Sequence, residues 1–168
     1  MQHRGCINGS FVPFIYASPI DDLIKELKFG SGLAAGRELG ALMMARGSPR
    51  RMPQVLIPVP LHWRRLARRG YNQSQVIAEH LSKHCGLPLL GACRRSRFTL
   101  AQAQLNAHVR TRNVRGAFEV SGVVRGLHVA IVDDVITTGA TMRELVRVLR
   151  RAGASRVEVW AAARAVGF

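Results

Sequence analysis

Two kinds of apolar pattern recur along this chain. Short uninterrupted apolar runs predict buried strands, and apolar residues at helical spacing predict helices between them. Residues 129–132 form an uninterrupted apolar run, which is typical of a strand buried on both faces in a parallel sheet. The helix expected after it carries an apolar face with the spacing i, i+3, i+4 and i+7, formed by Met142, Leu145, Val146 and Leu149. The pattern therefore predicts an α/β fold with a mainly parallel sheet flanked by helices.

The same patterns place further elements before and after this motif. A helix is expected from Ser18 as N-cap and Pro19 at the first position, followed by a second helix over residues 33–46. Asn72 is expected to cap a third helix that runs through His84 and closes at Gly86. Residues 1–17 are predicted to be irregular or extended. The other predicted strands are residues 55–60, 87–90, 118–121 and 156–163.

Two carboxylates end the central apolar run. Asp133 and Asp134 would stand at the carboxyl end of the strand, where open α/β sheets place their ligands. Two adjacent carboxylates suit either a hydrated Mg²⁺ or a pair of sugar hydroxyls. An isolated Asp-Asp pair is also common in solvated turns, so its position behind a fully apolar strand is what favours a site.

A short segment of small and hydroxylated residues joins the acidic pair to the next helix. It consists of Thr137, Thr138, Gly139, Ala140 and Thr141. The free N–H groups of a first helical turn carry partial positive charge, Gly139 permits close approach, and the hydroxyls add donors. We therefore expect a phosphate at this place, and the whole motif describes a site for a sugar phosphate with a metal.

An arginine-rich segment follows the strand expected at residues 55–60. Arginine stands at four positions within residues 61–73, and Gly70 can adopt an unusual backbone conformation. Such a loop can hold a pyrophosphate through bidentate guanidinium contacts. A solvated basic loop is the alternative interpretation.

Residues 91–115 are polar, rich in arginine and only weakly periodic. A long excursion of this kind from a compact domain often acts as a lid over a site. The alternative is a peripheral helical hairpin with a basic, solvated face.

Length and composition restrict the class of protein. A chain of 168 residues with 48% apolar residues can bury one core and is expected to form one domain over residues 1–168. It has neither an apolar run of about 18 residues nor the charge order of a signal peptide, so we expect no membrane insertion and a cytoplasmic location. Cys6, Cys85 and Cys93 form no CxxC pair, and His80 and His84 are better interpreted as partly buried helix residues than as metal ligands, so zinc is not expected.

The formal net charge of +15 is extreme for this length. Such a surface attracts polyanions, including nucleotides, pyrophosphate and nucleic acids. A generally arginine-rich proteome would produce the same composition, so charge by itself indicates no particular ligand.

Residues 129–141 resemble the 5-phosphoribosyl-1-pyrophosphate (PRPP) motif of type I phosphoribosyltransferases, and residues 58–73 resemble the signature of the competence protein F (ComF) family. The resemblance covers nearly the whole chain and implies a type I phosphoribosyltransferase-like fold with a flexible hood loop. Many members carry a cysteine-rich zinc module ahead of this domain, of which this chain has at most the trailing cysteine, Cys6, so we expect either that the module is lacking or that the start was truncated.

The resemblance also implies roles for individual residues. The acids would be catalytic and would hold Mg²⁺ or the ribose hydroxyls, and residues 137–141 would bind the 5-phosphate. Pyrophosphate would be bound by Leu61, His62, Arg68, Arg69 and Gly70. The flexible loop would include Arg97, Thr99, Gln102 and Arg110.

Two functions remain open from the resemblance. One is transfer of phosphoribosyl from PRPP to an acceptor with release of pyrophosphate. The other is a non-catalytic role in DNA uptake, in which the chain binds single-stranded DNA or competence-machinery proteins and uses the site only to sense PRPP. The sequence indicates neither the acceptor nor the oligomeric state.

Overall fold

The computed structural model describes residues 7–30, 32–97 and 114–165 of the chain. Within these ranges, five strands form one parallel sheet in the order β1-β7-β6-β3, and β2 also pairs with β7. The strands are β1 (Gly9–Phe11), β2 (Phe14–Ile15), β3 (Val55–Pro58), β6 (His128–Ile136) and β7 (Arg156–Arg164). The predicted α/β fold with a mainly parallel sheet is therefore confirmed.

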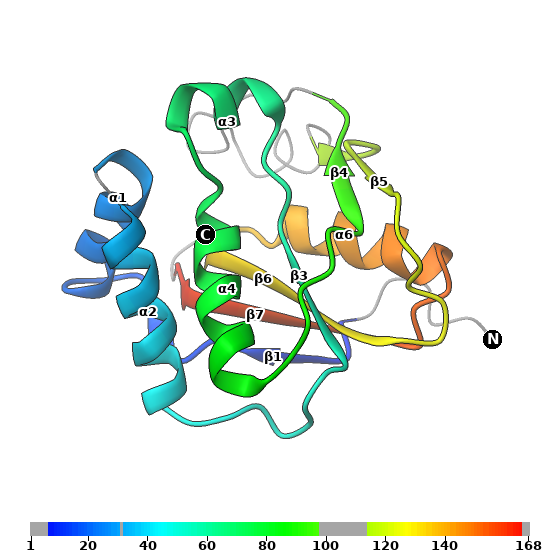
Figure 1. The fold of residues 1–168 in the computed structure, drawn as a ribbon, viewed down its shortest axis with the longest axis horizontal. Coiled ribbons are helices and arrows are strands. Elements are labelled where there is room, and N and C mark those ends of the chain that lie inside the picture. The colour runs from blue at the N-terminus through cyan, green and yellow to red at the C-terminus, as the bar shows by residue number, and fades with distance from the viewer. Residues whose placement is uncertain (1–6, 31, 98–113, 166–168) are drawn as a thin grey trace.

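Helices cover both faces of this sheet (Figure 1). Alternate residues of β6 point to opposite faces. Ala130 and Val132 pack with α1 (Ile20–Phe29), α2 (Leu33–Ala45) and α4 (Gln73–Cys85), whereas Val129 and Ile131 pack with α6 (Ala140–Arg151). Because both faces are covered, the two central strands are apolar at nearly every position.

A second, smaller sheet lies beside α6. β4 (Cys93–Arg95) pairs antiparallel with β5 (Phe118–Val120). The strand expected at residues 118–121 thus exists but does not join the central sheet. Of the strand expected at residues 87–90, only an isolated parallel bridge between Leu56 and Leu89 is present.

Two predictions about local structure were wrong. The arginine-rich segment is not a loop, because α3 (Trp63–Arg69) is a short helix that lies at the top of Figure 1. Ser18 is not the N-cap of α1, since Pro19 occupies that position and the Ser18 hydroxyl donates to the Asp22 carboxylate at 3.2 Å.

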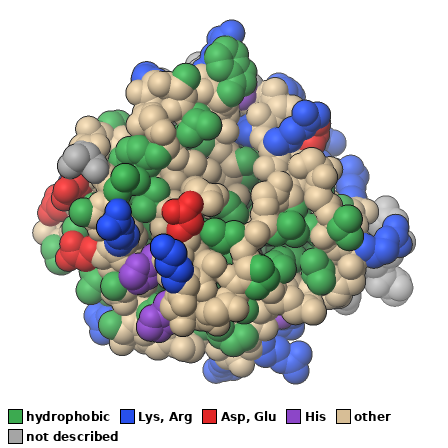
Figure 2. Space-filling model, in the orientation of Figure 1, with side chains coloured by type: hydrophobic (Ala, Val, Ile, Leu, Met, Phe, Trp, Pro, Cys, Tyr) green, Lys and Arg blue, Asp and Glu red, His purple; other side chains and the backbone are tan. Residues whose placement is uncertain are grey.

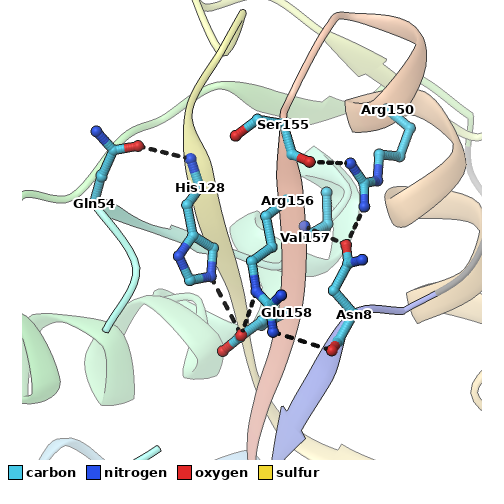
Figure 3. A network of polar contacts seen from close by, with 8 residues as sticks. All are labelled: Asn8, Gln54, His128, Arg150, Ser155, Arg156, Val157 and Glu158. Carbon is cyan, nitrogen blue, oxygen red and sulfur yellow. Dashed lines mark hydrogen bonds and ion pairs between the residues drawn. The ribbon is translucent and has the colours of Figure 1, made fainter. Parts of the chain in front are cut away.

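The N-terminal segment, predicted to be irregular or extended over residues 1–17, supplies the edge of the sheet. β1 and β2 both lie along β7, separated by Pro13, which has no N–H to donate. Asn8 strengthens this edge, because its side-chain oxygen accepts the Val157 N–H at 3.0 Å and also a bond from Arg150 (Figure 3).

A buried carboxylate organises the polar network of Figure 3. Glu158 is 4% exposed and receives Arg156 Nε at 2.8 Å, and His128 Nε2 lies 3.3 Å from the same oxygen. Burial lowers the pKa of His128 although Glu158 acts in the opposite direction. This network ties β6 and β7 together at their amino ends, away from the acidic pair.

None of the helices in the described ranges is long and apolar enough to cross a membrane.

Candidate functional site

The acidic pair lies at the carboxyl end of β6 and is held by two helices from the same face of the sheet. Ser74 at the start of α4 donates its hydroxyl to Asp133 Oδ1 at 2.8 Å. Lys28 of α1 places Nζ 3.1 Å from Asp134 Oδ2, and the Val135 N–H donates to Asp134 Oδ1 at 2.7 Å. Both carboxylates are thus fixed in position before a ligand arrives.

Asp133 is electrostatically strained. Burial, followed by the neighbouring Asp134 carboxylate, raises the pKa of Asp133 from its ordinary value of 3.8 to about 7, against the Ser74 hydroxyl and the Lys28 ammonium. Near neutral pH the carboxyl is therefore divided between its protonated and ionised forms. A cation or hydroxyl donors delivered by a ligand would favour the ionised form.

The segment after β6 has the geometry of an anion site. Gly139 is the N-cap of α6, with φ of +70° and without a side-chain cap. In the described part of the chain, the N–H groups of Gly139 and Ala140 donate to no backbone carbonyl. The Thr138 hydroxyl is buried and has no hydrogen-bond partner among the described residues. Unsatisfied donors at a helix N-terminus, with the dipole behind them, favour a phosphate.

One cavity of about 590 Å³ brings these parts together. Asp133 and Asp134 line it, and so do Thr137, Gly139, Ala140 and Thr141, whereas Thr138 does not. Of the residues expected to bind pyrophosphate, Leu61, Arg68 and Arg69 line the cavity, and His62 and Gly70 do not.

Helix α3 explains which arginines reach this cavity. Arg65, Arg68 and Arg69 are spaced i, i+3 and i+4, which places them on one helical face, and all three line the cavity. Gly70 ends the helix in the left-handed conformation, with φ of +80°. Sequence reasoning missed Arg65 because it treated the segment as a loop, although the helical spacing was visible.

His62 begins α3 rather than contacting the cavity. Its Nδ1 accepts the Arg64 N–H at 3.2 Å, so the imidazole serves as the N-cap. Burial, and then the positive charges of Arg95, Arg64 and Arg65, lower the pKa of His62. A neutral imidazole suits this role, because Nδ1 must accept a hydrogen bond.

Distant segments supply further cavity residues that no local pattern marked. Lys28 comes from α1, Ser74 from α4 and Arg95 from β4. Burial and the nearby Arg65 lower the pKa of Arg95 to about 10, while Asp133 opposes that shift. Opposite charges of the acidic pair and the arginines therefore interact across the cavity.

The acidic pair does not form a complete metal cage. No group of three or more His, Cys, Asp or Glu residues that could hold a metal ion exists within residues 7–30, 32–97 and 114–165. Mg²⁺ commonly binds through one or two carboxylates, with water and substrate phosphates completing its shell. Asp133 and Asp134 thus fit an Mg²⁺ ion that arrives with a phosphorylated ligand.

The hood loop falls largely beyond the described residues. Thr99, Gln102 and Arg110 lie outside them. Arg97 is described and donates from Nη1 to the Arg115 carbonyl at 3.2 Å, but it does not line the cavity with the acids.

The parallel sheet, with an acidic pair and a threonine-rich helix start at its carboxyl edge, defines a type I phosphoribosyltransferase domain. A family model described as "Phosphoribosyl transferase domain" matches residues 66–165. The chain is 38% identical over 157 residues to "DNA utilization protein YhgH" of Escherichia coli K12, covering 89% of this chain and 69% of that one. It is 36% identical over 160 residues to "Competence protein F" of Haemophilus influenzae, covering 89% and 70%. The chain therefore belongs to the phosphoribosyl transferase domain family, and it is related to these two proteins over most of its length.

A solved structure agrees with this assignment. The glutamine PRPP amidotransferase from B. subtilis, solved with ADP and GMP, superposes with a TM-score of 0.55 at 26% identity. The match covers 82% of this chain but only 30% of that longer one. The similarity concerns the transferase fold and not the whole of the larger enzyme.

Proposed function

We propose that the 590 Å³ cavity binds PRPP. The observation that carries the proposal is that three chemically different parts line one space: the acidic pair, the start of α6 and the arginine face of α3. PRPP needs three such parts, because it has a phosphate, ribose hydroxyls and a pyrophosphate. Thr137, Gly139, Ala140 and Thr141 bind its 5-phosphate, Asp133 and Asp134 its ribose hydroxyls, and Arg65, Arg68 and Arg69 its pyrophosphate.

The chemistry that this arrangement supports is phosphoribosyl transfer. The bond from C1 of the ribose to the pyrophosphate oxygen breaks, its electrons leave with the pyrophosphate, and a nucleophilic atom of the acceptor bonds to C1. Positive charge develops at C1 in the transition state, and the carboxylates of Asp133 and Asp134 stabilise it. The guanidinium groups of α3 stabilise the negative charge of the departing pyrophosphate.

Mg²⁺ is the cofactor of this proposal. When bound, it supplies charge neutralisation for the pyrophosphate. Asp133 and Asp134 would hold it, directly or through the ribose hydroxyls. Because Lys28 already pairs with Asp134, the free protein is expected to bind Mg²⁺ weakly until PRPP brings further oxygen ligands.

Thermal unfolding with and without PRPP tests the binding step. Ligand at 100 times its Kd should stabilise the protein by about 2.7 kcal/mol, and the rise should require Mg²⁺. Asp134→Asn should abolish the rise. Glu79→Gln, which removes an exposed carboxylate from α4, should leave it intact. An unchanged melting temperature at millimolar PRPP would refute the site.

Release of pyrophosphate tests the transfer step separately. In the presence of a true acceptor, release should be fast and should disappear in Asp134→Asn. PRPP binding without acceptor-dependent release of pyrophosphate would support the sensing role and refute the enzymatic one.

The relatives support a second candidate function, a DNA-handling role without turnover. One is named a DNA utilization protein and another competence protein F, and this chain carries a net charge of +15. Single-strand binding that falls steeply with salt and is unaffected by Asp134→Asn would support this function. Loss of DNA binding in that variant would argue for a single shared site instead.

A further inference from the structure

A second cavity, of about 460 Å³, is lined by residues of α6 and by residues that follow β4 and precede β5. Its lining residues are Arg97, Arg115, Gly116, Arg147 and Arg151. None of them lines the cavity that contains the acidic pair. Four arginines converge on this space, and no carboxylate is among its described lining residues. We call it the arginine cavity.

The buried carboxylate of Glu144 links two residues that line the arginine cavity, Gly116 and Arg147. Glu144 is 7% exposed, and its Oε1 accepts the Gly116 N–H at 2.7 Å and Arg147 Nη2 at 2.6 Å. Its Oε2 accepts Arg147 Nε at 2.8 Å. Burial by itself would raise the pKa of Glu144, but these hydrogen bonds outweigh burial and hold the pKa below its ordinary value. Glu144 is therefore ionised at neutral pH, and it orients Arg147 through a bidentate pair.

The balance of charge around this cavity is strongly positive. Among the described residues, four guanidinium groups face one nearby carboxylate, that of Glu144, so three positive charges are left without a balancing carboxylate. The carbonyl of Arg115 accepts a hydrogen bond from Arg97, which holds these two residues close together. Like charges in one concave space repel each other unless an anion neutralises them.

Helix capping does not account for these arginines. Arg150 already serves the end of α6, because it donates to the carbonyl groups of Ala154 and Ser155. Arg143, Arg147 and Arg151 instead follow each other at four-residue intervals, roughly 6 Å apart along the helix. Arg143 Nη1 lies 3.2 Å from where a Cβ on Gly139 would stand, so this row begins at the phosphate segment of the first cavity.

The positions of the acidic residues also bear on the charge around the arginine cavity. On the face drawn in Figure 2, acidic side chains lie on the side of α1 and also over the middle of the face, and Lys and Arg side chains lie both within the face and around its margins. Four of the ten acidic residues belong to α1 and α2, namely Asp21, Asp22, Glu26 and Glu38. Glu119 of the small sheet is already paired with Arg94 at 2.5 Å.

We propose that the arginine cavity is a second phosphate-binding site, which takes a run of linked phosphate groups. The shared chemistry is that of a small polyphosphate or of the phosphodiester backbone of a single-stranded nucleic acid. Planar guanidinium groups recognise phosphate oxygens in pairs, and Glu144 has already ordered one of them, so less side-chain entropy is lost on binding. The inference does not depend on PRPP binding at the first cavity.

The test compares two double variants that each remove two positive charges. Arg115→Gln/Arg151→Gln removes the positive charges of two residues that line the arginine cavity and leaves the Glu144–Arg147 pair intact. Arg37→Gln/Arg50→Gln, at exposed positions of α2 and of the segment before β3 that line neither cavity, is the matched control. Binding of inorganic tripolyphosphate and of a 12-nucleotide oligothymidylate is measured by calorimetry, with Arg68→Gln/Arg69→Gln included to identify binding at the first cavity.

We expect Arg115→Gln/Arg151→Gln to weaken at least one probe about tenfold relative to the control pair. Loss of tripolyphosphate binding alone identifies a free polyphosphate as the ligand. Loss of oligothymidylate binding, with a shallower salt dependence, identifies the nucleic acid backbone. Equal affinities of the two double variants for both probes would overturn the proposal. PRPP binding is measured in the same variants: it should be unchanged in Arg115→Gln/Arg151→Gln and in Arg37→Gln/Arg50→Gln, and weakened in Arg68→Gln/Arg69→Gln, so failure of the first site would be recognised separately.

Discussion

Replacing Asp133 with asparagine should stabilise the folded protein while destroying the proposed PRPP site. The amide side chain keeps an oxygen that can accept the Ser74 hydroxyl, but the change removes a carboxyl that burial and Asp134 make costly to ionise. Residues optimised for binding charge often reduce the stability of the free protein. The variant therefore separates the contribution of Asp133 to function from its effect on folding.

The pKa of Asp133 sets the size and the pH window of the effect. The folded state binds the proton more tightly than the unfolded chain, so the contribution of this carboxyl to stability is greatest below pH 3.8 and is lost as the pH rises to about 7. The difference between 3.8 and about 7 corresponds to about 4 kcal/mol at 1.36 kcal/mol per pH unit. This is a ceiling, because any relaxation that admits water to the carboxylate reduces it.

Urea unfolding at pH 5, 6, 7 and 8 measures this effect. The stability of Asp133→Asn minus that of the natural chain should increase with pH up to about 7 and then level off. Glu79→Gln should show no comparable gain between pH 5 and 8. A stability difference for Asp133→Asn that does not change with pH would refute the idea that ionisation of this carboxyl is costly.

Three further substitutions test the packing that positions the site. Asn72→Ala should cost about 1–2 kcal/mol in urea unfolding, because Asn72 caps α4 and donates to the Val59 carbonyl at 2.9 Å, and Asn72→Ser should recover part of this by restoring the cap. Gly36→Ala should lower the free energy of unfolding by about 1–3 kcal/mol, since its Cβ would lie 2.6 Å from a Val76 methyl. An unchanged melting temperature would show that α2 and α4 can separate freely. Asn8→Ala should cost about 1–3 kcal/mol and increase amide exchange of β1, because it leaves the part-buried Val157 N–H without its acceptor. Unchanged exchange would contradict that role.

The sequence alone determined the features that depend on neighbouring residues. The apolar run of residues 129–132 predicted the buried β6, and the helical periods predicted α2, α4 and α6 to within about two residues. The acidic pair and the segment of residues 137–141 were recognisable because their parts are contiguous. Local periodicity is sufficient wherever one continuous segment supplies both the element and its chemistry.

Only the tertiary structure decided which distant residues meet the acidic pair. Lys28 and Ser74 come from helices far from β6 in sequence, and Arg95 comes from a strand of the small sheet. No periodicity in any of these segments specifies the partner across the fold. The pairing of β1 and β2 with β7 was equally invisible, since two- and three-residue strands are stabilised by the neighbour they join rather than by their own sequence.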